Sequence, residues 1–517
     1  MTMFIFIEFE QVNGLKYTVR LIIFIILLYF IYIFLEDYIK GTFLQYISIF
    51  ISFSVVFISF VIFLENRQPT QTLTWLVVLG GFPIVGFIFY LLFGRNYRKE
   101  RLYRKKYFLD KQTYIKYERD QDIEENINGL PTGQQKLYRL AQRLSNSPIS
   151  FATTSKILTN GQETFDHIIE AIYNAKHHIH LEYYIVRDDH IGQEIKHLLI
   201  KKAKEGVKVR FLYDAVGSWY LPNEYKKDLL KAGVEIVAFG PVHLPFLNNK
   251  FNFRNHRKII VIDGYIGFMG GLNIGDEYLG RDKSFGFWRD THLMIKGEAV
   301  RSLQLIFLQD WYYMTNKSLL SDEYLLACFP ENGRKAGGVQ MIAGGPDNEW
   351  SVIKNIFFSM INTAKQSVWI ASPYFIPDDD IFSAIKIAAL SGIDVRILVP
   401  KKPDKRIVWF ASRSYFPELL EAGVKIYEYE QGFMHSKFII VDQEFASIGT
   451  SNMDMRSFHL NFEVNAFLYQ TESTKKLVKE FLNDLESSHP LELEQFRKRR
   501  FGYRLLESTS RLLSPLL

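Results

Sequence analysis

The sequence predicts an α/β protein in which two homologous lobes follow an N-terminal anchor of transmembrane helices. Three observations carry this prediction: long uncharged runs near the N-terminus, helical patterns that alternate with short β-branched runs after residue 150, and segments that occur twice in the chain. A chain of 517 residues with 48% hydrophobic residues can build several cores, so we expect at least two folded units.

The composition sets broad limits on partners and location. A formal net charge of +6 is small for 517 residues, so the positions of the charges say more about partners than their sum. The single cysteine, Cys328, excludes an internal disulfide. It is compatible with a reducing compartment without requiring one.

Two uncharged stretches near the N-terminus are long enough to cross a bilayer. Gly41 to Leu64 has 24 residues, and Leu73 to Phe93 has 21. At 1.5 Å per residue, the shorter one reaches about 31 Å, which matches a hydrocarbon core. An earlier run, Leu21 to Leu35, has only 15 uncharged residues and could be a third span or an interfacial segment. We predict two or three transmembrane helices.

A basic cluster after the last apolar run sets the expected orientation. Seven bases face one acid, Glu100, and by the positive-inside rule the chain beyond Phe93 is cytoplasmic. The N-terminus lies outside if there are three spans and inside if there are two. The predicted location is therefore the cell membrane, multi-pass, with cytoplasmic lobes. The bases are Arg95, Arg98, Lys99, Arg101, Arg104, Lys105 and Lys106.

Beyond residue 150 the chain contains two copies of one α/β unit. Gly206–Leu212 matches Gly392–Leu398, and Leu230–Ile236 matches Leu420–Ile426, with offsets of 186 and 190 residues. In the second pair, glycine is expected to end a helix before a strand. We predict an anchor with its basic flank at 1–106, a linker at 107–150, lobes at 151–330 and 331–490, and a basic and apolar tail at 491–517.

The most specific repeat is a polar motif, H-x-K-x4-D, with an asparagine downstream. Four apolar residues separate lysine from aspartate in each copy, as expected of a strand buried on both faces. The strand period of two then places histidine and lysine on the same face. The copies lie 179 residues apart and comprise His256, Lys258, Asp263 and Asn273, and His435, Lys437, Asp442 and Asn452.

This residue set suits phosphodiester chemistry. Histidine can attack phosphorus or transfer a proton near neutral pH, while lysine and asparagine can neutralise and orient phosphoryl oxygens, so no metal is required. Two histidines allow a displacement through a covalent intermediate, with one acting as nucleophile and the other as acid. Asp263 and Asp442 belong to the candidate catalytic set as motif members. Their strands carry them about 17 Å beyond the lysines, so we expect them to support the site.

The duplicated motif resembles the signature of the phospholipase D superfamily. Further segments, among them Asn255–Lys258, Phe287–Asp290 and Ser372–Pro377, resemble bacterial cardiolipin synthases over nearly the whole chain. The resemblance implies two α/β/α lobes that meet at a pseudo-twofold interface. It also implies that phosphatidylglycerol is both donor and acceptor, giving cardiolipin and glycerol without cofactor or metal.

The resemblance also implies roles for single residues. Glu463 is expected to orient His435, and Asp290 is expected to orient His256. We take His256 as the nucleophile and His435 as the acid and base, although the near-equivalent lobes allow the reverse. Because one histidine must be neutral and the other protonated, the pair should titrate as a coupled unit with a bell-shaped rate profile.

Other readings remain open at this stage. The same site could hydrolyse phospholipids, serve another phosphatidyl transfer, or belong to an inactive membrane scaffold, and we expect no nucleic-acid partner. The oligomeric state is undecided. His177, His178 and His180 match no zinc spacing. The tail, with Arg497 to Arg500 before its leucines, could lie on anionic membrane lipid or form a solvated helix.

Overall fold

The computed structural model describes residues 53–60, 62, 69–82, 86, 90, 127–128, 131–241, 252–325, 337–348 and 350–514. The chain divides into two compact units, Met1–Gly94 and Arg95–Leu517. Both predicted lobes lie in the second unit.

The first unit covers most of the segment that was predicted as an anchor at 1–106. Residues 53–60 are helical, and α3 spans Pro69–Gly81; the ring of Trp75 contacts Tyr90 edge to face with centroids 5.3 Å apart. Among the residues that the structure describes here and elsewhere, no helix combines the length and the apolar character that a bilayer crossing needs. The run Leu21 to Leu35 and the basic flank from Arg95 to Lys106 lie outside the described residues, as do parts of both longer runs.

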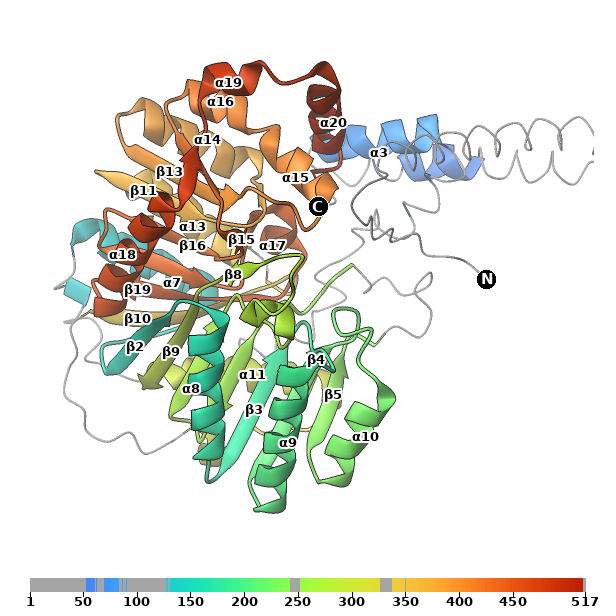
Figure 1. The fold of residues 1–517 in the computed structure, drawn as a ribbon, viewed down its shortest axis with the longest axis vertical. Coiled ribbons are helices and arrows are strands. Elements are labelled where there is room, and N and C mark those ends of the chain that lie inside the picture. Colours follow the sequence, from blue (N-terminus) through green and yellow to red (C-terminus); the bar gives the residue numbers. More distant parts are fainter. Residues whose placement is uncertain are drawn as a thin grey trace, which may run out of the picture. The chain divides into compact units, whose positions relative to one another are not determined.

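The first lobe is built on a seven-stranded sheet (Figure 1). Strands β3, β4 and β5, at one end of the sheet, are parallel, and the remaining pairs are antiparallel. In order across the sheet, the strands are β2 (Thr153–Leu158), β9 (His292–Gly297), β7 (Ile266–Gly270), β6 (Ile259–Ile262), β3 (His178–Tyr183), β4 (Lys208–Asp214) and β5 (Glu235–Phe239). The helices are α8 (Gly161–Tyr173), α9 (His190–Lys204), α10 (Asn223–Lys231), α11 (Ala299–Thr315), α12 (Asp322–Leu325) and the short 3-10 helix η2 (Asp276–Leu279).

The second lobe repeats this sheet and adds one strand at each edge. Its nine strands run in the order β1 (Ile149–Ser150), β10 (Gly338–Gly344), β19 (Glu463–Tyr469), β17 (Phe445–Gly449), β16 (Phe438–Val441), β11 (Ser367–Ala371), β13 (Asp394–Pro400), β14 (Lys425–Tyr429) and β20 (Ser488–Pro490). The short strands β12 (Phe375–Ile376) and β18 (Met453–Asp454) pair with each other. The helices are α13 (Val352–Thr363), α14 (Asp379–Leu390), α15 (Arg406–Arg413), α16 (Phe416–Glu421), α17 (Met455–His459) and α18 (Glu472–Glu486).

The two sheets share one topology, which confirms the predicted duplication. Strands β10-β19-β17-β16-β11-β13-β14 correspond in order and direction to β2-β9-β7-β6-β3-β4-β5. The lobes differ after the second parallel strand. Helix α15 follows β13, whereas turns alone connect β4 to α10.

Paired glycines make matching turns in both lobes. Gly233 follows α10 at φ +90°, and its counterpart Gly423 follows α16 at φ +91°. This left-handed conformation costs a residue with a Cβ about 1 kcal/mol or more, so glycine is favoured where a helix must turn at once into a strand. The prediction from the repeated Ala-Gly-Val segments is confirmed.

The last part of the segment that was predicted as a linker at 107–150 is folded into the second lobe. Helix α7 (Thr132–Ser145) packs against α13, and β1 pairs with β10, so residues 132–150 extend the second lobe. The tail also folds onto this lobe. Helix α19 (Leu493–Arg497) contacts α16, and α20 (Phe501–Arg511) contacts α15.

The strands that follow the two H-x-K pairs in the chain, β6 and β16, are buried on both faces, as predicted. In β6, Ile259 and Val261 join a core shared by the two lobes, whereas Ile260 and Ile262 face α8, α9 and α10. Strand β16 alternates in the same way. Burying each such side chain contributes about 1.5–3 kcal/mol, so both strands are fixed in register and hold the motif residues that precede them.

Candidate active site

Each H-x-K pair lies immediately before a core strand and places histidine beside lysine. The Lys258 ammonium donates to the backbone carbonyl of His256 at 2.7 Å, and Lys437 donates to that of His435 at 2.6 Å. The Lys437 Nζ also lies 3.0 Å from Nδ1 of His435. The two lobes thus share the contact between lysine and the backbone, and the second lobe adds a contact between lysine and the histidine ring.

Backbone pairing between the lobes brings the motifs together. The amide of His256 donates to the carbonyl of Phe462 at 2.9 Å, next to a bridge between Asn255 and Phe462. In the counterpart contact, β15 (Gly432–Met434) runs parallel to β8 (Phe287–Arg289), and the amide of His435 donates to the carbonyl of Arg289 at 2.7 Å. The backbone of each histidine therefore pairs with a residue of the other lobe that directly precedes a carboxylate in the chain.

These carboxylates bind the histidines across the interface. Nδ1 of His256 lies 2.9 Å from Oε2 of Glu463, and Nδ1 of His435 lies 2.6 Å from Oδ2 of Asp290. The expected pairing within each lobe, Glu463 with His435 and Asp290 with His256, is wrong. The reason is the interlobe backbone pairing, which places Glu463 next to Phe462 and Asp290 next to Arg289.

The two carboxylates are themselves held by hydrogen bonds. Glu463 accepts from the hydroxyl of Thr450 and from the side-chain amide of Asn461 at 3.2 Å. Asp290 accepts from the backbone amide of Thr291 at 2.7 Å. Burial raises the pKa of both carboxyls, but the neighbouring histidines and lysines outweigh it, so both pKa values lie below the ordinary range. Both groups are thus carboxylates that fix the ring tautomers.

The site is buried enough to shift its bases strongly. Burial lowers the pKa of His256 and of His435 to about 4, although Glu463 and Asp290 oppose the shift. Burial likewise lowers the pKa of Lys258 to about 7 and of Lys437 to about 8. Because burial disfavours the charged forms of these histidines and lysines, an anionic phosphodiester beside them would favour their protonation.

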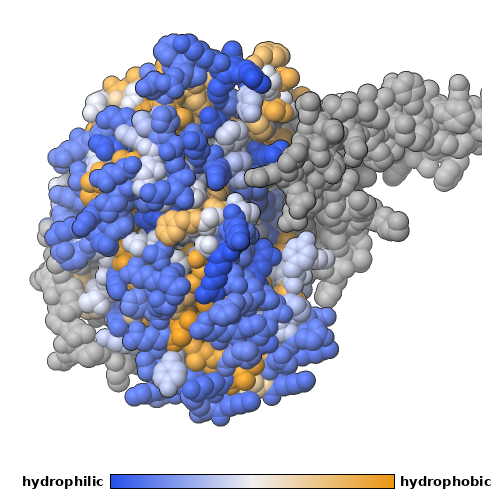
Figure 2. Space-filling view, in the orientation of Figure 1, coloured by the Kyte–Doolittle hydropathy of each residue, from blue (hydrophilic) through white to orange (hydrophobic). Residues whose placement is uncertain are grey.

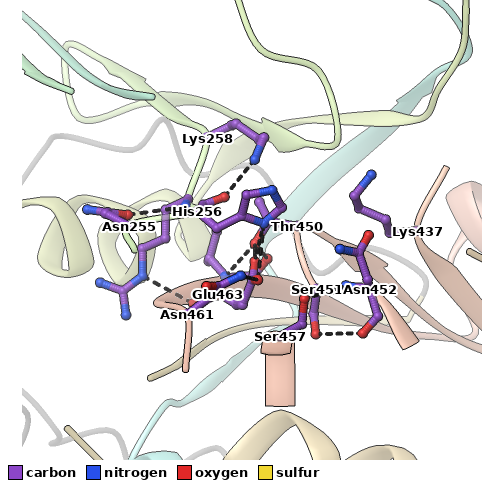
Figure 3. Close-up of polar contacts among 12 residues, drawn as sticks. Asn255, His256, Lys258, Lys437, Thr450, Ser451, Asn452, Ser457, Asn461 and Glu463 are labelled. Atoms are coloured by element: carbon purple, nitrogen blue, oxygen red, sulfur yellow. Dashed lines mark hydrogen bonds and ion pairs between the residues drawn. The ribbon is translucent and has the colours of Figure 1, made fainter. Parts of the chain in front are cut away.

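Residues of both lobes lie around the ring of His256 (Figure 3). His256 and Lys258 come from the first lobe, and Lys437, Asn452 and Glu463 come from the second. The Lys437 charge lowers the pKa of both His256 and Lys258. The predicted residues of the two motifs therefore act on one another electrostatically across the interface.

The two asparagines are engaged differently. Asn273 accepts from the amide of Ile185 at 3.1 Å and donates to the hydroxyl of Tyr278 at 3.0 Å. The side-chain oxygen of Asn452 is buried and has no partner within the described part of the chain. Its amide group lies on the side of the site where Lys437 lies (Figure 3).

The motif aspartates lie away from the histidines, at the opposite ends of β6 and β16. Asp263, at φ +52°, accepts from the backbone amides of three successive residues at 2.8, 2.8 and 2.9 Å, which ties its turn to the start of β3. Asp442, at φ +51°, does the same at the start of β11 with distances of 2.7 to 3.1 Å. The structure does not bring either of them to the candidate catalytic set. The amide donors are Lys176, His177, His178, Lys365, Gln366 and Ser367.

Two tyrosines outside the predicted site flank the histidines. The ring of Tyr184 lies 5.0 Å from that of His256, and the ring of Tyr374 lies 6.4 Å from that of His435, both nearly edge to face. Trp288 also packs on His435, at 4.9 Å. The signal that could have identified the tyrosines is their position within three residues after two corresponding strands, β3 and β11.

The histidine-rich stretch at 177–180 belongs to the packing of the first lobe. The rings of His178 and His180 lie within 3.1 to 3.2 Å of the side-chain oxygen of Gln304, and burial lowers the pKa of both. Within the described ranges, no group of three or more metal-ligating side chains is arranged around a common point.

A family described as "Cardiolipin synthase, PLD-like domain" matches residues 168–311 and 357–485, one match in each lobe. A second, described as "Phospholipase D-nuclease N-terminal", matches residues 49–95. A cardiolipin synthase of Geobacillus sp. (strain WCH70) is 63% identical over 509 residues, covering 97% of this chain and 100% of that protein. One of Halalkalibacterium halodurans is 62% identical over 506 residues, covering 98% and 100%.

A solved structure shares the fold at low sequence identity. The crystal structure of a phosphatidylserine synthase of Haemophilus influenzae Rd KW20 aligns with a TM-score of 0.55 and 18% identity, covering 74% of this chain and 100% of that one. The similarity supports the arrangement of the two lobes.

Proposed function

The chain belongs to the cardiolipin synthase family of phospholipase D-like proteins and is a phosphatidyltransferase, and we propose that phosphatidylglycerol is both its donor and its acceptor. The products would be cardiolipin and glycerol. Because one phosphodiester is exchanged for another, the reaction is close to isoenergetic and needs no activated donor.

The observation that carries the proposed mechanism is the pair of histidine–carboxylate contacts across the lobe interface. A carboxylate at Nδ1 leaves Nε2 as the reacting atom of each ring. Lys258 and Lys437 stand beside the rings and are poised to gain protons when an anion binds. This arrangement supports a displacement at a phosphodiester with one histidine on either side.

In the first step, Nε2 of His256 attacks phosphorus of the donor. A bond from nitrogen to phosphorus forms as the bond from phosphorus to the glycerol oxygen breaks. The negative charge of the bound phosphodiester, together with that of Asp290, favours protonation of His435, and the imidazolium gives this proton to that oxygen as glycerol leaves. The phosphatidyl group is now on His256, and His435 is neutral. Lys258, Lys437, Asn273 and Asn452 would neutralise and orient the nonbridging oxygens.

In the second step, neutral His435 takes the proton of a primary hydroxyl on the second phosphatidylglycerol. The oxygen attacks phosphorus, and the bond from phosphorus to His256 breaks. Cardiolipin forms, His256 returns to its neutral state, and His435 again carries the proton needed for the next cycle.

The contacts of the two rings support this order of roles. Nδ1 of His256 faces the two oxygens of Glu463, at 2.9 and 3.1 Å, which holds the tautomer whose Nε2 has a free lone pair. Nδ1 of His435 faces Asp290 and also the Lys437 ammonium. The Lys437 charge disfavours the protonated His435 ring, so this ring readily releases its proton to the leaving oxygen.

Sequence features support a membrane location for this reaction. The proposed anchor comprises the spans Gly41 to Leu64 and Leu73 to Phe93, with Leu21 to Leu35 as a third candidate, and the bases after Phe93 favour cytoplasmic lobes. An anchor would keep the site close to substrates that remain in the bilayer. We retain Asp263 and Asp442 as supports of the motif strands.

The decisive experiment gives the purified full-length chain phosphatidylglycerol as the sole phospholipid. Cardiolipin and glycerol in equal amounts are expected. Phosphatidic acid with glycerol would show hydrolysis instead, and no product would show an inactive scaffold. The His256→Ala variant, assayed at the same concentration, controls for a contaminating enzyme and should give no product.

A further inference from the structure

Helix α20 has its polar side buried and its apolar side exposed. Glu507 and Ser510 are the buried residues of the helix, and Glu507 is bonded to Arg499 and lies 3.9 Å from Arg413. By contrast, Phe501 and Leu505 are 77% and 56% exposed. A soluble surface helix shows the opposite pattern, so the outer side of α20 is suited to an apolar environment.

The apolar residues form a narrow strip opposite the buried side. At about 100° per residue, Phe501, Leu505 and Leu512 fall within about 40° of one another, and Glu507 and Ser510 point the other way. Leu512 is 67% exposed. Hydrophobic residues gather at the surface of this helix in Figure 2.

Helix α15 continues the same surface. It packs against α20, the ring of Phe410 lies 6.0 Å from that of Tyr503, and Ile407 is 52% exposed. The first lobe has no counterpart of this helix after β4. The surface is therefore an addition to the repeated lobe rather than part of its common framework.

Exposed bases lie beside the apolar strip. Within the described residues, no ion pair involves Lys498, Arg500 or Arg504. On the loop before α15, Asp404 is the only exposed acid near Lys405 and Arg406. We call this surface the α15–α20 face. The apolar members of its strip are Ile407, Phe501, Leu505 and Leu512, with Tyr503 and Leu506 farther round the helix, and its bases are Lys405, Arg406, Lys498, Arg500, Arg504 and Arg511.

We propose that the α15–α20 face docks on the surface of an anionic lipid bilayer. The apolar strip enters the boundary between headgroups and acyl chains, and the bases meet the lipid phosphates. The excess of bases favours this partner over an apolar protein surface, because only an anionic layer neutralises them along the whole strip. The inference builds on the proposed function in taking membrane phospholipids as substrates.

The position of the face relative to the active site gives docking a purpose. Trp409 and Arg413 of α15 line a small surface hollow together with Tyr374, whose ring lies 6.4 Å from that of His435. A bilayer held against α15 therefore brings headgroups to a hollow next to the second histidine. Docking at this face would present acceptor lipids on the His435 side.

The test places a probe on the full-length chain. In a Cys328→Ser background, Leu505→Cys is labelled with an environment-sensitive fluorophore and reconstituted into phosphatidylcholine vesicles with or without phosphatidylserine, which adds charge without serving as the proposed substrate. Nitroxide groups on the acyl chains should quench the probe in anionic vesicles. The matched control is Leu230→Cys on α10, since Leu230 and Leu505 are both 56% exposed, and it should not be quenched.

Charge reversal tests the bases separately. Because each near-surface base contributes about fivefold in affinity, Arg500→Glu with Arg504→Glu should lower the ratio of docked to undocked probe at least tenfold. Lys226→Glu with Lys227→Glu on α10 should leave it unchanged. A Leu505 probe quenched by neither lipid nor aqueous iodide would show a protein cover, from the N-terminal unit or a second copy, and would overturn the proposal. So would free access to iodide in both vesicle types.

The same variants separate this inference from the proposed function. In detergent micelles, where no bilayer is present, the reversed variant should make cardiolipin at the wild-type rate. Cardiolipin synthesis without lipid quenching of the probe would refute the docking face alone. Absence of synthesis by the wild-type chain would refute the proposed function instead.

Discussion

Nδ1 of His256 lies 2.9 Å from the carboxylate of Glu463, a residue of the opposite lobe. His435 and Asp290 make the reciprocal contact at 2.6 Å. The active site is therefore composite in both halves, because neither lobe alone holds a histidine together with the carboxylate that orients it. Substitution of Glu463 and substitution of Asp290 should therefore impair different parts of the reaction.

Glu463→Gln and Asp290→Asn should respond differently to the leaving group. We expect both to slow cardiolipin formation by roughly 10- to 100-fold. With the p-nitrophenyl ester of phosphatidic acid, whose leaving group needs no proton, the first-turnover burst of Asp290→Asn should recover because His435 is no longer needed as acid. That of Glu463→Gln should stay slow. Recovery of Glu463→Gln instead would reverse the two orienting roles.

Asp263→Asn and Asp442→Asn should weaken the fold more than the chemistry. Each carboxylate accepts from three backbone amides at the start of a core strand, and hydrogen bonds to charged groups contribute about 1.5–3 kcal/mol. The expected result is a loss of about 2 kcal/mol, measured by denaturant unfolding, with kcat of the folded enzyme changed only a few-fold. Asp166→Asn on α8, an exposed aspartate, is the control. A 1,000-fold loss of kcat at unchanged stability would contradict the supporting role.

The affinity for phosphodiesters should fall as the pH rises. Lys258, with a pKa of about 7, and Lys437, with a pKa of about 8, are protonated below these values and lose their charge above them. A soluble dialkyl phosphate stays a monoanion throughout. Its inhibition constant should therefore rise at least tenfold between about pH 6 and about pH 9, with proton uptake on binding near pH 8.

Lys258→Arg is the matched variant for this titration. Arginine remains charged, so the part of the pH dependence centred near pH 7 should disappear while the part near pH 8 remains. An inhibition constant that does not change with pH in the wild-type chain would show that the two lysines do not titrate in this range before the inhibitor binds.

The sequence was informative where the signal is local or repeated. The identical order of the core strands follows from segments such as Gly206–Leu212 and Gly392–Leu398, and the positions of His256 and His435 follow from the motif spacing. Burial of Ile259 and Ile262 follows from an unbroken apolar run. These features depend on residues that are close together in the chain.

The pairing of Glu463 with His256 could not be read from spacing. It depends on the bridge between Asn255 and Phe462, and its counterpart depends on the parallel pairing of β8 with β15, both of which join segments of different lobes. Strand β1 precedes the first lobe in the chain but pairs with β10 of the second sheet. This pairing is also a tertiary contact, and two residues are too short a segment to predict it from the sequence.

The proposed intermediate should be found on His256. In a His435→Gln variant, the p-nitrophenyl ester still allows the first step, because its leaving group departs unprotonated, but the second step lacks its base. Phosphatidyl-enzyme should accumulate, and mass spectrometry of an alkaline-quenched digest should place the adduct on the peptide with His256. The control variant, His256→Gln, keeps the acid but removes the nucleophile and should trap nothing. An adduct on His435 in that control would exchange the two roles, because Nε2 of the ring held by Asp290 would then be the atom that attacks phosphorus.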